Sequence, residues 1–63
     1  MITYKNHIID TVLSENHQPV WVAIINGVYH TNYTSSDTEE ECVEKAKQEV
    51  DKMIKYGNKK RHN

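Results

Sequence analysis

The stretch Val20-Trp21-Val22-Ala23-Ile24-Ile25-Asn26-Gly27-Val28-Tyr29-His30-Thr31-Asn32-Tyr33 decides the fold of this chain. Asn-Gly between two β-rich runs predicts a hairpin with a two-residue type I′ turn, because Asn and Gly best tolerate the positive φ that both turn positions need. A turn of this length also fixes the register of the two strands. The expected cross-strand pairs are Ile25 with Val28, Ile24 with Tyr29, Ala23 with His30, Val22 with Thr31, Trp21 with Asn32 and Val20 with Tyr33.

A further strand is expected before this hairpin. Residues 2–13 are rich in β-branched and apolar side chains, with an interruption near Lys5-Asn6. The polar connection 14–19 is too short to hold a crossover helix, so the first two strands should be antiparallel neighbours. The sequence therefore predicts a three-stranded meander with residues 20–25 in the centre.

One helix should follow the sheet. Thr38 is the expected N-cap, and Glu41 three residues later completes a capping box. Apolar residues then recur at helical spacing, which indicates an amphipathic helix of about 18 residues. Gly57-Asn58 is expected to end it. We predict an α+β fold: a three-stranded antiparallel β-meander followed by one C-terminal amphipathic helix packed on one sheet face, with no helix anywhere in residues 8–33. The domain is expected to span 1–57, followed by a basic tail at 58–63.

The central strand is apolar on both of its faces, although one helix covers only one of them. Ala23 is small enough for a helix to approach closely, so the helix should cover the face with Trp21, Ala23, Ile25 and Val28. The opposite face should then stay open, and an apolar patch of this size usually marks an interface. The predicted partner interface consists of Val20, Val22, Ile24, Tyr29, Thr31 and Tyr33. We expect a homodimer through this face, because a chain of 63 residues is marginally stable alone.

Composition points to the cytoplasm. The single cysteine, Cys42, excludes an intramolecular disulfide, and neither a signal peptide nor a membrane-spanning stretch is recognisable. The net charge is −1, but residues 37–51 carry seven acids and two lysines while residues 52–63 carry five bases and no acid. This segregation is typical of a helix whose charges complement its dipole. Alternatively, the basic end contacts phosphate, and the residues that would do so are Lys55, Lys59, Lys60 and Arg61.

No pattern of residues indicates catalysis or metal binding. The four histidines and Cys42 lack the short spacings of a zinc site. No nucleophile elbow or glycine-rich phosphate loop is present. We therefore expect no catalytic, cofactor-binding or metal-binding residues, and no ligand cavity of several hundred Å³.

One family resemblance can be recognised from the motifs. Trp21-Val22-Ala23, followed by Asp37-Thr38-Glu39-Glu40-Glu41 and then by Ala46-Lys47, resembles the HicB-like antitoxin domain. The likeness covers residues 20–50, and the motif also occurs in generic small β-β-β-α proteins of phages and mobile elements. Asn26-Gly27 stands where that family has a proline-rich turn, and its DNA-binding C-terminal segment has no counterpart here. The resemblance implies a sheet-plus-helix fold that binds a protein partner.

The sequence thus favours a small non-catalytic interaction module (inhibitor, antitoxin-like or adaptor) that binds a larger protein. The alternative is a small nucleic-acid-binding protein that uses the basic helix end and tail together with sheet aromatics, since exposed aromatic rings stack on bases. The sheet carries almost no cations, which weighs against this alternative because phosphate contacts dominate such binding.

Overall fold

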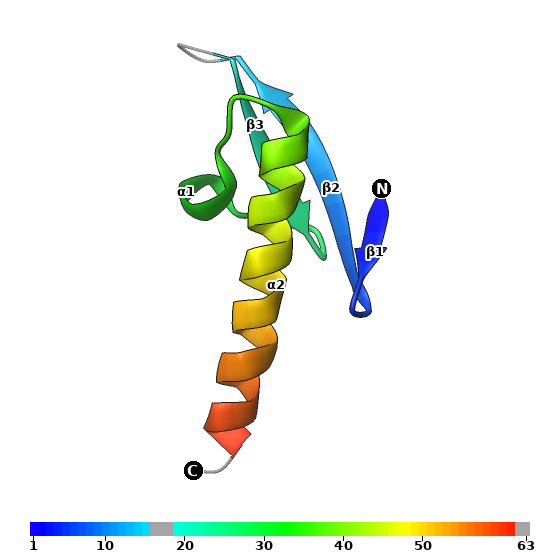
Figure 1. Cartoon of the computed structure of the whole chain (residues 1–63), viewed down its shortest axis with the longest axis vertical. Helices are drawn as coiled ribbons and strands as arrows, with labels where there is room; N and C mark the ends of the chain where they lie inside the picture. Colours follow the sequence, from blue (N-terminus) through cyan, green and yellow to red (C-terminus); the bar gives the residue numbers. More distant parts are fainter. Residues whose placement is uncertain (16–18, 62–63) are drawn as a thin grey trace.

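The computed structural model describes residues 1–15 and 19–61, with only the backbone described for 57–61. Within these residues the chain is an α+β fold, in which an open antiparallel sheet is followed by a C-terminal helix (Figure 1). Four strands lie side by side in sequence order. The elements are β1 (Ile2–Tyr4), β2 (His7–Ser14), β3 (Val20–Ile25), β4 (Val28–Tyr29), α1 (Thr31–Thr34) and α2 (Glu39–Arg61).

The first predicted strand is in fact a second hairpin. Lys5 and Asn6 both have positive φ, at 49° and 68°, and form a two-residue turn that pairs Tyr4 with His7. The prediction of a single strand was wrong because Lys-Asn is a weaker turn signal than Asn-Gly. This turn fixes the register of β1 against β2, in which Ile2 lies opposite Ile9.

The Asn26-Gly27 turn is confirmed. Asn26 and Gly27 have φ of 51° and 83°, and the predicted pairs Ile25–Val28 and Ile24–Tyr29 are present. The Asn26 side chain also accepts a hydrogen bond from the backbone N–H of Ile8 at 2.9 Å. The turn therefore anchors the start of β2 as well as joining β3 to β4.

The strand after this turn is much shorter than predicted. β4 ends at Tyr29, and residues Thr31–Thr34 form α1, a single helical turn, so the expectation of no helix in residues 8–33 was wrong. The predicted pairs beyond Tyr29 do not form as a strand: Trp21 bridges to Ser36, not to Asn32. Residues 31–36 combine Thr, Ser and Asn, whose side chains offer the backbone alternatives to a ladder.

Helix α2 begins as predicted. The backbone N–H of Glu41 donates to Thr38 Oγ1 at 3.2 Å, which confirms Thr38 as the N-cap. The helix does not end at Gly57-Asn58 but continues to Arg61, so α2 is 23 residues long in all. A glycine inside a helix costs only about 1 kcal/mol, and no proline follows to force an end. The basic residues of its last turns also suit the negative end of the helix dipole.

The core lies between α2 and the two central strands. Ile9, Ala23 and Ile25 from the sheet pack against Cys42, Ala46 and Val50 from the helix, with Tyr4 and Trp21 at the margin. The predicted placement of Trp21, Ala23 and Ile25 on the helix side is confirmed. Val28 is 58% exposed, so its predicted place under α2 was wrong. It lies in the two-residue edge strand, while α2 packs over β2 and β3.

Candidate functional site

The face of the sheet opposite α2 is the first candidate interaction surface, and we call it the open sheet face. Side chains alternate along a strand, so the register assigns this face to the even-numbered residues of β2 and β3 and to Tyr29. α2 lies on one side of the sheet and α1 lies beside β3 (Figure 1). Helix α2 therefore does not cover the open sheet face. Its apolar members are Ile8, Val12, Val20, Val22, Ile24 and Tyr29.

Exposure varies across the predicted interface residues. Tyr29 is 64% exposed, and Val20 and Ile24 are half-buried. Val22 is only 3% exposed, so the expectation that it would be free in a single chain was wrong. Its cross-strand neighbour on this face is Val12.

Thr31 and Tyr33 do not belong to the sheet, contrary to the predicted register. Both lie on α1, where Thr31 is exposed and Tyr33 is 65% exposed. Ile8 and Val12 take their place as members of the open sheet face, with Ile8 44% exposed. The missed signal was the register of β2 against β3, which pairs Asp10 with Ile24 and so places Ile8 and Val12 on the same face as Ile24.

A groove between β1, β2 and the first turns of α2 is the second candidate surface. Its volume is about 480 Å³, so the expectation that the chain has no such cavity was wrong. The volume lies in the range of small-ligand and peptide-side-chain pockets. The apolar lining of this groove comes from Met1, Ile2, Ile9 and Val43.

The rim of the groove is acidic. Thr11, Glu39, Glu40 and Glu44 complete its lining. Thr11 Oγ1 donates to Glu39 Oε2 at 2.6 Å, which fixes that carboxylate against β2. Glu40 and Glu44 take part in no ion pair among the side chains that the structure describes. The groove is therefore suited to a cationic group with an apolar body.

The predicted phosphate-contacting residues all lie on α2. Lys55 is exposed, one turn beyond Asp51. Lys59, Lys60 and Arg61 occupy helical positions, and their side chains are outside the described part of the structure. Trp21 is partly buried against the core on the α2 side, so it is separated from Tyr29 by the sheet itself.

A cluster around Asp51 ties the β1–β2 turn to α2. Lys5 Nζ lies 2.8 Å from Asp51 Oδ1, and the Tyr4 hydroxyl donates to the same oxygen at 3.1 Å. The hydrogen bond from Lys5 lowers the pKa of Asp51, and the bond to Asp51 raises the pKa of Lys5. Lys47 lies over the Tyr4 ring, 5.6 Å from its centroid. These contacts hold β1 in place and so shape one wall of the groove.

The residue types that act in catalysis or bind metals are dispersed among the described residues. Among the described residues no three His, Cys, Asp or Glu side chains gather where they could hold a metal ion. Cys42 is fully buried, and burial raises the pKa of its thiol, which disfavours the reactive thiolate. His17 and His62 lie outside the described residues. The described chain also has no helix that combines the length and the apolar character needed to cross a membrane.

No protein-family model, curated protein or solved structure matches this chain. The resemblance to the HicB-like antitoxin domain therefore stays a prediction based on the residues quoted above.

Proposed function

We propose that this chain is a small non-catalytic protein-interaction module, of the inhibitor, antitoxin-like or adaptor type, that forms a homodimer through the open sheet face. The observation that carries the proposal is that this face bears apolar side chains along β2 and β3, while α2 packs over the opposite face of the sheet. Ile8 on β2 is 44% exposed, and Tyr29 on β4, on the other side of β3, is 64% exposed.

The energetics favour covering this face. Burying one large aliphatic or aromatic side chain contributes about 1.5–3 kcal/mol. A domain of this size rarely has more than about 3–5 kcal/mol of stability from its own core. Pairing the open sheet face with the same face of a second copy is the simplest closed arrangement, because a twofold interface is self-complementary.

Ile24→Glu tests this proposal. Ile24 is half-buried at the middle of the open sheet face, so a carboxylate there would be desolvated opposite its own copy. We expect the wild type to have a dimer mass by light scattering at micromolar concentration and Ile24→Glu to be a folded monomer. Gln48→Glu, which adds the same charge at an exposed position of α2, should remain a dimer. A monomeric wild type would contradict the homodimer and would leave this face to a larger protein partner.

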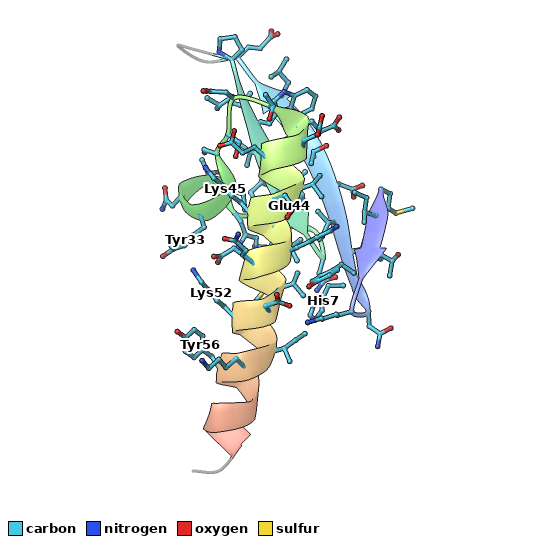
Figure 2. All side chains as sticks on the ribbon, viewed as in Figure 1. His7, Tyr33, Glu44, Lys45, Lys52 and Tyr56 are labelled. Carbon is cyan, nitrogen blue, oxygen red and sulfur yellow. The ribbon has the colours of Figure 1, made fainter. Side chains whose placement is uncertain are left out.

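Nucleic-acid binding is the second candidate, favoured by a group of exposed aromatic and basic side chains. Tyr33 on α1 projects to the same side of α2 as Lys45, Lys52 and Tyr56 (Figure 2). Tyr33 and Tyr56 are 65% and 55% exposed, and exposed aromatic rings stack on unpaired bases. This surface combines exposed aromatic rings with basic groups, although Lys52 already contacts Glu49 at 3.2 Å.

Anisotropy of a labelled single-stranded RNA would decide this candidate. If the chain binds nucleic acid through this surface, Tyr33→Ala and Lys52→Glu should each weaken binding several-fold, and affinity should fall steeply as salt rises. Val28→Ala, at an exposed position of the edge strand, should bind like the wild type. Affinity that is insensitive to both variants would exclude this surface as the binding site.

A further inference from the structure

The C-terminal part of α2 extends beyond the sheet as an unpartnered helix among the described residues. Figure 1 shows α2 continuing past the end of the strands, with no other described element beside it. We call residues 52–61 the overhang. Upstream, Cys42, Ala46 and Val50 form a fully buried stripe against the sheet.

The apolar stripe does not stop where the sheet does. Met53 and Ile54 follow Val50 at helical spacing and are 38% and 36% exposed, and Tyr56 is 55% exposed. A helix face that is apolar but uncovered is typical of a segment that docks in a groove. The overhang therefore carries the features of a docking helix.

The overhang is also strongly basic. Residues 52–61 contain four lysines, one arginine and no acid, whereas residues 37–51 carry seven acids and two lysines. The groove lies along this acidic part of α2, with an apolar lining and with Glu40 and Glu44 on its rim. The two surfaces of one chain are thus complementary both in charge and in apolar character.

The overhang cannot reach the groove of its own chain. The acidic side chains of the groove and the lysines of the overhang belong to one continuous helix. Glu40 and Lys59 are separated along this helix by about 28 Å at 1.5 Å per residue. The groove that the overhang fits must therefore belong to a second copy.

We infer that the overhang of one chain docks in the acidic groove of a second copy. Met53 and Ile54 would contact the accessible apolar lining at Ile2 and Val43, while the lysines of the overhang pair with Glu40 and Glu44. The groove lies on the α2 side of the sheet, so this contact is separate from the open sheet face and goes beyond the proposed homodimer. Two chains that exchange overhangs form a closed pair, whereas a one-way contact leads to a filament.

A charge-exchange experiment in the Ile24→Glu background tests this inference, since that substitution is aimed at the open sheet face only. One variant adds Glu40→Lys and Glu44→Lys to the groove, and another adds Lys55→Glu and Lys59→Glu to the overhang. We expect the Ile24→Glu parent to self-associate at low salt in sedimentation velocity and each charge variant to associate at least about tenfold more weakly, because like charges then meet across the contact. An equimolar mixture of the two variants should recover the association.

A matched control separates the groove from general charge effects. Asp37→Lys with Glu41→Lys makes the same change in net charge at the same end of α2, but neither residue lines the groove. This control should associate like its parent. A monomeric Ile24→Glu parent at low salt, or a mixture that fails to recover association, would overturn the inference while leaving the open-sheet-face homodimer to its own test. If Ile24→Glu fails to fold, the same charge variants are made in the wild-type background. The wild type should then form species larger than a dimer at low salt, and each charge variant should form fewer of them. The absence of this difference would contradict the inference.

Discussion

Ala23→Glu is expected to unfold the chain. Ala23 is completely buried at the centre of β3, where it packs with Cys42, Ala46 and Val50 of α2. The larger side chain would push the helix off the sheet, and its carboxylate would be buried without a partner. An uncompensated buried charge costs several kcal/mol, which exceeds the stability of about 3–5 kcal/mol that so small a core supplies.

The matched control for this prediction is Ile24→Glu, one residue further along the same strand. Its side chain points to the open sheet face, so the carboxylate reaches water in a single chain. Circular dichroism and thermal melts should show a cooperative transition for Ile24→Glu and none for Ala23→Glu. If Ala23→Glu folds and Ile24→Glu does not, α2 covers the other face of the sheet.

The parts of the fold that the sequence predicted are those governed by local chemistry. Asn26-Gly27 specified its turn because only a few residues tolerate two successive positive φ values. Thr38 specified the start of α2 through a side-chain bond to a backbone N–H three residues on. The small size of Ala23 in an otherwise bulky strand predicted which face the helix approaches. Each of these signals acts within a few residues.

The parts that were missed depend on competition between neighbouring or distant segments. Lys5-Asn6 forms a turn although Lys is an unusual residue at positive φ, because the pairing of β1 with β2 compensates for the strain. The groove exists only because β1 folds back beside β2, which in turn packs against α2, and no local pattern encodes that arrangement. Its acidic rim was visible in the sequence, but the same residues equally suit a helix N-terminus.

The segment that contains α1 is the clearest case of a local sequence pattern that is compatible with two structures, a strand and a helical turn. Residues 28–33 are β-rich, and the Asn26-Gly27 turn would have allowed them to extend along β3 as far as Val20. The ladder instead continues for only one further backbone bond, from His30 N–H to the carbonyl of Ala23 at 3.0 Å. Beyond it, the chain turns away, and a side chain takes over the role of the missing strand.

That side chain is Thr34, and Thr34→Val is expected to destabilise the fold by about 1–3 kcal/mol, the usual cost of leaving a buried donor unsatisfied. Thr34 is fully buried, and its Oγ1 accepts a hydrogen bond from the backbone N–H of Ala23 at 2.9 Å while donating to the carbonyl of His30 at 2.7 Å. Valine matches threonine in shape but has no hydroxyl. In this variant the carbonyl of His30 still accepts a hydrogen bond from the backbone N–H of residue 34, whereas the backbone N–H of Ala23 loses its acceptor.

Thr34→Ser separates the hydrogen bond from the packing. Serine keeps the hydroxyl and loses one methyl group, which contributes about 0.8 kcal/mol when buried. Urea denaturation of the three proteins should therefore place the midpoint of Thr34→Val below that of Thr34→Ser, with the wild type highest. The reverse order of the two variants would mean that the methyl group, and not the bond to Ala23, holds α1 against β3. A midpoint of Thr34→Val equal to that of the wild type would mean that the N–H of Ala23 finds another acceptor once the hydroxyl is gone.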